Sequence, residues 1–331
     1  MRLQDFSRFP LTTTPTPLTR AVNLERVLGS NSPRIYLKRD DLTGLAYGGN
    51  KARKLEYLVA DALAKDATVL VTEGAVQSNH ARMTAAAAVL AGLKSTLVLD
   101  TRLGAEPVGN LLLDTLLGAD VRLVAGKIDR SKEMAQVGDE LRAAGERPYL
   151  VPTGGSVPLG ALGYVACVAE LQTQLQAIDE TPSHLYFSTS SLGTHAGLLV
   201  GAKAFATTFA IVGVSADGKS DDLRSRLRAL AQATASLIDL ETPFADDDLI
   251  VDDGYTGPGY AIATPECLTA IRLLARTEAV FLDPVYSAKA MAGLLDHIHR
   301  GDFSPTDTVV FLHTGGGPSL FIHGDELLAG E

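Results

Sequence analysis

One lysine stands where its charge is unfavourable. Gly48-Gly49-Asn50 leads into a stretch with helical spacing of apolar residues, which places Lys51 in the first turn of a helix. A cation there meets the positive end of the helix dipole, and Arg53 and Lys54 add two more cations in the same turn. The pattern favours a bound anion nearby or a lysine used in its neutral form, which can attack an aldehyde. A solvated lysine without a role is the alternative.

Three glycine-bearing junctions each follow an expected buried strand and precede an expected helix. The carboxyl ends of parallel strands are where open α/β sheets bind ligands, and helix N-termini favour anions. One such loop is most often only a turn, but three together indicate a polar crevice that receives an anion. The junctions are at 74–79, 188–194 and 315–317.

The elements that position these loops alternate between strand and helix. This alternation predicts an α/β fold with a mostly parallel sheet and helices on both faces. We expect the acidic segment 245–253 to be a solvated connection. The strands are expected at 34–38, 68–72, 95–99, 120–124, 148–151, 184–188, 210–215 and 308–313, and the helices at 23–28, 51–65, 79–92, 108–117, 131–144, 159–175, 194–205, 220–235, 265–276 and 287–300.

Composition narrows the class of protein. A chain of 331 residues with 46% hydrophobic and 21% charged residues predicts a globular protein of two domains. The net charge of −10, without a basic run, argues against nucleic-acid binding. Cys167 and Cys267 fit buried, inert thiols, and no spacing suggests a metal. No segment resembles a signal peptide or a membrane span, so we expect a cytoplasmic location and no membrane partner.

Several motifs along the chain carry a resemblance to known enzymes. They are KRDD from Lys38, GGNKARKLEYLVADAL from Gly48, EGAVQSNHARMTAA from Glu73, GTHAG from Gly193, GPGYAIATPE from Gly257, LDPVYSAKAMAGL from Leu282 and HTGGGPSLF from His313. Together they resemble a branch of the fold-type II pyridoxal phosphate enzymes that contains 1-aminocyclopropane-1-carboxylate deaminase, D-cysteine desulfhydrase and L-cysteate sulfo-lyase. The matches run in the family's order from about residue 6 to residue 321.

The resemblance implies a fold and an assembly. It implies a tryptophan synthase β-like architecture with two open, twisted, mostly parallel sheets and helices on both faces. It implies a large cofactor-binding domain, residues 1–50 with 164–331, and a small domain, residues 51–163. It also implies a homodimer that acts on a small amino acid with pyridoxal 5′-phosphate as cofactor.

The resemblance also implies roles for individual residues in holding the cofactor. Lys51 matches the lysine that forms a Schiff base, the internal aldimine, with the cofactor. Asn79 matches the asparagine that bonds the phenolic oxygen, and Lys54 adds charge near the phosphate. The loop of Ser190, Leu192, Gly193 and Thr194 matches the loop that binds the cofactor's phosphate. Thr314 matches the residue that faces the ring nitrogen of the cofactor.

A second group of residues matches the substrate side of the site. Ser78, with Asn79 and His80, corresponds to the helix start near the substrate carboxylate and Cα. Tyr260 and Tyr286 correspond to the two active-site tyrosines, which would otherwise fit half-buried packing residues. Either Lys51 or Ser78 would remove the α-proton.

Two positions distinguish the activities within this branch. The deaminase pattern has a glutamate directly after the second tyrosine, whereas Ser287 follows Tyr286 here and Thr314 stands in the C-terminal loop. A neutral hydroxyl at the ring nitrogen makes a weaker electron sink than a carboxylate partner does, which favours expulsion of a good β leaving group over cyclopropane opening.

D-cysteine, cleaved by β-elimination to pyruvate, sulfide and ammonia, is therefore the first expectation. L-cysteate, which gives sulfite, is the alternative, and its sulfonate would need a donor such as His80, Arg82 or His195. The deaminase activity is less expected.

Two other classes stay open on the residues alone. A nucleotide-binding oxidoreductase could use the same crevice, although no G-x-G-x-x-G with a ribose-binding acid is present. A ligand-binding protein without activity is the second possibility, because a fold does not determine a function.

Overall fold

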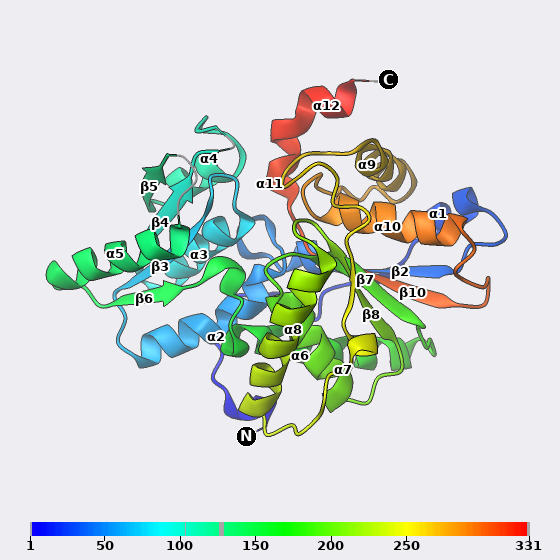
Figure 1. The fold of residues 1–331 in the computed structure, drawn as a ribbon, viewed down its shortest axis with the longest axis horizontal. Helices are drawn as coiled ribbons and strands as arrows, with labels where there is room; N and C mark the ends of the chain where they lie inside the picture. Colours follow the sequence, from blue (N-terminus) through cyan, green and yellow to red (C-terminus); the bar gives the residue numbers. More distant parts are fainter. Residues whose placement is uncertain (1, 103, 126–128, 330–331) are drawn as a thin grey trace.

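The strands form two separate sheets. The computed structural model describes residues 2–102, 104–125 and 129–329. The larger sheet has the order β1-β2-β10-β7-β8-β9, and all of its pairs are parallel except β1 with β2 (Figure 1). Its strands are β1 (Leu18–Arg20), β2 (Arg34–Arg39), β7 (His184–Thr189), β8 (Ala210–Ser215), β9 (Ile250–Asp252) and β10 (Thr308–His313).

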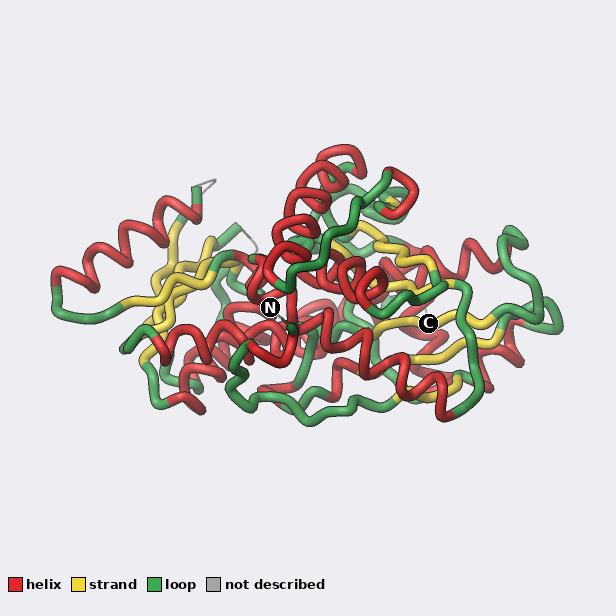
Figure 2. The backbone as a smooth tube through the Cα atoms, turned by 90° about the horizontal axis from the view of Figure 1, so that it is seen from below, coloured by secondary structure: helices red, strands yellow, loops and turns green. Residues whose placement is uncertain are grey.

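The smaller sheet has four parallel strands in the order β5-β4-β3-β6. Its central strand β3 is buried along its whole length, as a parallel strand covered on both faces must be. Figure 2 shows the two groups of strands lying apart with helices between them. The strands are β3 (Val69–Ala75), β4 (Lys94–Asp100), β5 (Asp120–Val124) and β6 (Pro148–Val151).

Helices cover both faces of both sheets. On the larger sheet, α6, α7 and α8 pack in one apolar core, and α1, α9 and α10 pack in another. On the smaller sheet, α2 and α3 lie on one face and α5 on the other. The helices are α1 (Val22–Leu28), α2 (Lys51–Ala64), α3 (Asn79–Ala91), α4 (Gly109–Leu116), α5 (Arg130–Ala143), α6 (Pro158–Ala177), α7 (Gly193–Ala204), α8 (Ser220–Leu237), α9 (Pro265–Glu278), α10 (Ser287–His299), α11 (Gly317–Leu320) and α12 (Gly324–Leu328).

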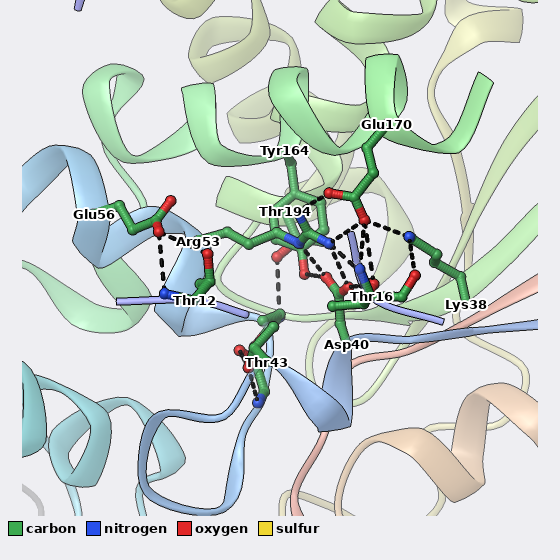
Figure 3. A network of polar contacts seen from close by, with 12 residues as sticks. Thr12, Thr16, Lys38, Asp40, Thr43, Arg53, Glu56, Tyr164, Glu170 and Thr194 are labelled. Atoms are coloured by element: carbon green, nitrogen blue, oxygen red, sulfur yellow. Dashed lines mark hydrogen bonds and ion pairs between the residues drawn. The ribbon is translucent and has the colours of Figure 1, made fainter. Parts of the chain in front are cut away.

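A buried ionic network ties α2 to the larger sheet (Figure 3). Arg53 donates to both carboxylate oxygens of Asp40, at 2.7 and 2.8 Å, and also to Glu170 on α6. Tyr164 donates to Asp40, and Lys38 on β2 pairs with Glu170. Burial alone would raise the pKa of Asp40, but Arg53 holds it below its usual value. The network fixes the helix that begins with Lys51.

The predicted fold class is confirmed, and each expected helix and strand is present within a few residues of its expected bounds. The prediction that 245–253 is only a solvated connection is wrong. Leu249 and Val251 are buried, and β9 forms an edge strand on β8, because its apolar residues pack on the sheet despite the acidic flanks. The domain division stays a prediction, and its boundary at 163/164 falls inside α6. In the described part of the chain, no helix is long and apolar enough to span a membrane.

Candidate active site

A cavity of about 460 Å³ opens at the carboxyl ends of strands from both sheets. We call it the pocket. Gly74 and Ala75 end β3 there, Ser188 and Thr189 end β7, and Thr314 follows β10. Of the predicted site residues, Gly193 and Lys54 do not line it. Those that do are Lys51, Ser78, Asn79, His80, Ser190, Leu192, Thr194, Tyr260, Tyr286 and Thr314.

Lys51 is the first residue of α2, as the sequence predicts. Gly48 makes this position possible because its φ is +67° and a Cβ there would lie 1.9 Å from the carbonyl oxygen of Asp41. The Lys51 ammonium donates to Asn50 Oδ1 at 2.9 Å. Burial and the charge of Arg82 lower the pKa of Lys51 to about 8. A sizeable fraction of this amine is therefore neutral near pH 7.5, which a nucleophilic lysine requires.

The loop Ser190–Thr194 begins α7 and closes one end of the pocket. Leu192 has a left-handed φ of +72°, which turns the chain into the helix. A Cβ on Gly193 would lie 2.9 Å from the backbone Cα of Ser156 and 2.9 Å from Lys54 Nζ, so glycine lets the loop pack closely against Ser156 beside this lysine. Lys54 lies fully buried behind the loop and donates to the carbonyl of Gly154 at 3.1 Å. Burial, with the charge of Lys51, lowers the pKa of Lys54 well below its ordinary value.

Two hydroxyls beside this loop are buried without a hydrogen-bond partner in the described structure. They are Ser188 Oγ and Thr189 Oγ1, and both residues line the pocket. An unsatisfied buried hydroxyl is costly. Two such hydroxyls next to a helix N-terminus and a buried lysine fit an anionic group such as a phosphate.

The amide of Asn79 is oriented by its neighbours. Asn79 Oδ1 accepts hydrogen bonds from Arg82 and from Asn110 Nδ2, both at 3.0 Å. Arg82 is buried and also donates to Asn110 Oδ1 at 2.7 Å and to the carbonyl of Gly48 at 3.0 Å. Because the amide oxygen is occupied, the amide NH₂ is the group that Asn79 offers to the pocket. Asn110, on α4, is absent from the sequence-based assignment.

Ser78 and His80 stand at the start of α3. Ser78 caps the helix because its hydroxyl oxygen accepts a hydrogen bond from the N–H of Ala81. The hydroxyl proton takes no part in this bond. His80 Nε2 shares a hydrogen bond with Thr72 Oγ1 at 3.0 Å. Burial, with Lys51 and Lys54, lowers the pKa of His80 well below its ordinary value. His80 is therefore a neutral side chain in the pocket.

Tyr260 and Tyr286 meet across the pocket, with their hydroxyls 2.5 Å apart. Tyr286 is the N-cap residue of α10, and Tyr260 comes from the irregular segment between β9 and α9. Burial raises the pKa of Tyr260, and burial together with Tyr260 raises that of Tyr286. Both phenols therefore keep their protons at neutral pH. One hydroxyl donates to the other, which leaves one hydroxyl proton of the pair for a further acceptor.

Thr314 and Ser287 differ in position. Thr314 lines the pocket, and its carbonyl accepts from the N–H of Asn50 at 3.0 Å. Ser287 is buried outside the pocket lining, where its hydroxyl donates to Asp283 Oδ1 at 2.6 Å. Asp283 also accepts from the N–H groups of residues 285–287, so its carboxylate is saturated by the start of α10.

Two of the possible sulfonate partners lie outside the pocket lining. His195 is packed against the ring of Phe187, and burial lowers its pKa to about 3. It is a core residue. Arg82 lies behind Asn79. At the rim, two arginines that the sequence-based assignment missed line the pocket, Arg102 and Arg130. Their position directly after β4 and at the start of α5, again at strand carboxyl ends, was the available signal.

Both rim arginines are held by buried carboxylates. Arg102 Nε lies 2.9 Å from Asp100 Oδ1, and Arg130 Nη1 lies 3.1 Å from Asp100 Oδ2. Arg130 also pairs with Glu73 at 3.1 Å. Asp217, which follows β8 on the larger sheet, is a further carboxylate of the lining. The rim therefore presents balanced charge.

Known proteins resemble the chain over nearly its full length. The family described as "Pyridoxal-phosphate dependent enzyme" matches residues 10–315. The chain belongs to this family. It is 41% identical to a D-cysteine desulfhydrase of Yersinia pestis (strain Pestoides F), over 97% of each chain. It is 40% identical to a 1-aminocyclopropane-1-carboxylate deaminase of Bradyrhizobium diazoefficiens, over 97% of this chain and 98% of the relative.

A solved structure described as an ACC deaminase homologue superposes on this fold-type II enzyme with a TM-score of 0.91. Its sequence identity is 37%, and the match covers 99% of this chain and 97% of that one. The predictions of family, fold and pyridoxal phosphate as cofactor are confirmed. The pocket fits that cofactor, because it offers an amine, an anion-receiving helix start and a free amide donor.

Proposed function

We propose that this enzyme is a β-elimination lyase that converts D-cysteine and water to pyruvate, hydrogen sulfide and ammonia. The observation that carries the proposal is a neutral hydroxyl, Thr314, in the pocket wall, while Ser287 is turned onto Asp283. A hydroxyl at the cofactor's ring nitrogen limits the electron sink and suits a good β leaving group such as thiolate. In the deaminase pattern a glutamate follows the second tyrosine, and its carboxylate favours cyclopropane opening. Here Ser287 stands at that position.

The proposed site assigns each cofactor contact to a residue. Lys51 would hold the aldehyde carbon covalently, the Asn79 amide would bond the phenolic oxygen, and Thr314 would face the ring nitrogen. The phosphate would lie against Ser190–Thr194, with Lys54 supplying charge from behind. Bound pyridoxal phosphate supplies the electron sink that makes the α-proton of an amino acid removable.

The residues around the substrate have separate roles in this proposal. The substrate carboxylate would bind the open N–H groups at the start of α3, beside Ser78. Lys51 is the better α-proton base, because its pKa is near 8 and the Ser78 oxygen already accepts from Ala81. Tyr260 and Tyr286 share one hydrogen bond, and the phenol whose proton is not used in it would donate to the departing sulfur.

The charge of the pocket supports D-cysteine over L-cysteate. A sulfonate would need a cation that is not already paired. His80 is neutral, His195 and Arg82 lie outside the lining, and Arg102 and Arg130 are paired with Asp100 and Glu73. A thiol needs no cation. L-cysteate sulfo-lyase activity remains the second candidate because Arg102 and Arg130 do line the pocket.

The proposal is tested by a substrate panel and by trapping. Pyruvate release from D-cysteine, L-cysteine, L-cysteate and D-serine is measured side by side, and D-cysteine should have the highest kcat/KM. A higher value for L-cysteate would reverse the ranking. Borohydride reduction followed by mass mapping should place a pyridoxyl adduct on Lys51, and an adduct on another lysine would remove Lys51 from its role.

Assembly and location are further parts of the proposal. We propose a homodimer, as the resemblance to the family implies, and light scattering on the purified holoenzyme measures it. A mass equal to one chain would contradict it. The cytoplasmic location expected from the sequence and the division into a large and a small domain stay predictions.

A further inference from the structure

A buried lysine outside the pocket binds the segment that carries Tyr260. The Lys289 side chain on α10 has no exposed surface. Its ammonium donates three hydrogen bonds, all to backbone carbonyls: Thr256 at 2.6 Å, Ala216 at 3.1 Å and Gly259 at 3.2 Å. An ammonium has three donors, so the group is saturated by these three carbonyls.

The three carbonyls lie in segments that form neither helix nor strand. Thr256 and Gly259 lie in the stretch 253–264, which forms neither helix nor strand and contains Tyr260. Ala216 follows β8 and precedes Asp217, a pocket residue. Burying an ammonium costs several kcal/mol unless charge-assisted hydrogen bonds offset it. An apolar residue at 289 would leave these three carbonyls without this donor, and the loss would be most costly at Ala216, which is buried.

Lys289 is one of four residues along one face of α10 that contact or adjoin segment 253–264. Tyr286, Lys289, Gly293 and Asp296 follow each other at helical spacing and share one face of the helix. The Tyr255 ring packs on Gly293, where a Cβ would lie 3.0 Å from it, and the Tyr255 hydroxyl bonds Asp296. Tyr286 contacts Tyr260. We call these four residues the α10 seat.

We propose that Lys289 is a positioning residue that holds segment 253–264 on the α10 seat and so sets Tyr260 against Tyr286. This inference rests on the proposed function for the role of the two tyrosines in turnover. It makes a separate claim about the segment, because its order can be measured without substrate. Lys289 does not line the pocket and is not one of the proposed contacts of the cofactor.

The test uses Lys289→Met in the holoenzyme, which keeps the apolar stem and removes the ammonium. We expect kcat for D-cysteine to fall about 10- to 100-fold, the usual cost of misplacing a group. KM should change less, and the visible absorbance of the bound cofactor should stay as in the parent. Deuterium uptake by peptides from 253–264 should rise. The matched control is Lys203→Met. It removes a surface lysine of α7 that pairs with Asp248.

A second pair of variants keeps the proposal falsifiable if Lys289→Met does not fold. Gly293→Ala places a Cβ against the Tyr255 ring and should raise exchange in the same segment, with a smaller loss of kcat. Lys289→Ala opens a small cage of carbonyls, and methylammonium, but not tetramethylammonium, should restore part of kcat. Unchanged exchange and unchanged kcat in folded Lys289→Met would overturn the proposal. A parent enzyme inactive on D-cysteine would instead refute the proposed function and leave the exchange measurement valid.

Discussion

Arg53 and Lys54 are neighbours in α2, both are almost fully buried, and they have opposite electrostatic surroundings. Arg53 meets the carboxylates of Asp40 and Glu170 (Figure 3). Burial opposes its charge, but Asp40 holds the pKa of Arg53 well above its ordinary value. Lys54, like Lys51, forms no ion pair with a carboxylate in the described structure, and burial lowers the pKa of both lysines, although Asp283 partly offsets this at Lys51.

The difference separates scaffold from site. Where a buried charge has its counter-ions in the protein, folding is complete without a ligand. Lys54 lacks a counter-ion, and the hydroxyls of Ser188 and Thr189 lack hydrogen-bond partners in the described structure. We propose that the ligand supplies these missing partners. In the proposed assignment, the same helix turn therefore contributes one residue to stability and two to cofactor binding. Five substitutions or measurements can break or sharpen this contrast.

Lys51→Ala should have the largest effect. Turnover of D-cysteine should fall by about three orders of magnitude or more, because a positioned nucleophile and base is removed. The borohydride adduct at this position should disappear as well. Lys65→Ala, at the exposed end of the same helix, is the control and should keep full activity. Activity retained in Lys51→Ala would refute the assignment of the helix N-terminus as the reacting site.

Arg53→Met should act on stability. Removing one partner of a buried ion pair leaves Asp40 buried and uncompensated, which costs about 3–5 kcal/mol of the free energy of unfolding. The measurement is chemical denaturation of the apoprotein. Because the pKa of Asp40 is lowered in the folded state, the pair's contribution is complete above the unfolded pKa and is lost as the pH falls through the folded one. A loss confined to cofactor affinity would contradict the scaffold role.

Much of this contrast was readable in the sequence, and part of it was not. Strand–helix alternation and the glycine junctions are local patterns, so the fold class, the start of α2 at Lys51 and the loop Ser190–Thr194 could be predicted. The pairing of Arg53 with Glu170 joins residues 117 positions apart, and no local pattern shows it. Asn110 and Lys289 were missed for the same reason. The edge strand β9 was missed because acidic neighbours hid its three residues.

Lys54→Met should reverse the outcome of Arg53→Met. Affinity for pyridoxal phosphate should fall about 10- to 100-fold, the value of one hydrogen bond or charge contact to an anion. The free energy of unfolding of the apoprotein should stay the same or rise, because a buried amine without a counter-ion is removed. Pyridoxal without its phosphate is the discriminating ligand, and its affinity should not change. An equal loss for both ligands would place Lys54 elsewhere in the site.

The lowered pKa of Lys51 predicts a pH dependence for cofactor capture. Only the neutral amine reacts with the aldehyde, so the rate of incorporation into apoprotein should rise about tenfold per pH unit up to pH 8 and then level off. Stopped-flow absorbance measures it. The reaction of pyridoxal phosphate with N-acetyl-lysine, whose amine has a pKa of about 10.4, is the reference. A rate that still climbs at pH 10 would show that burial leaves Lys51 unperturbed.

Asn110→Ala should give the smallest effect, and it extends the contrast to α3. Asn110 and Arg82 both donate to the amide oxygen of Asn79, and these hydrogen bonds orient the Asn79 amide toward the proposed cofactor. Without Asn110 the amide can turn, and the donor to the cofactor's phenolic oxygen weakens. That donor stabilises the oxygen most when the nearby proton has left, so its loss should raise the pH midpoint of the cofactor's visible absorbance change by about half a unit. Thr115→Ala, on the same helix, removes only a bond to the carbonyl of Leu111 and should leave the midpoint unchanged. If both variants behave alike, α4 acts through packing and the orientation of Asn79 comes from Arg82 alone.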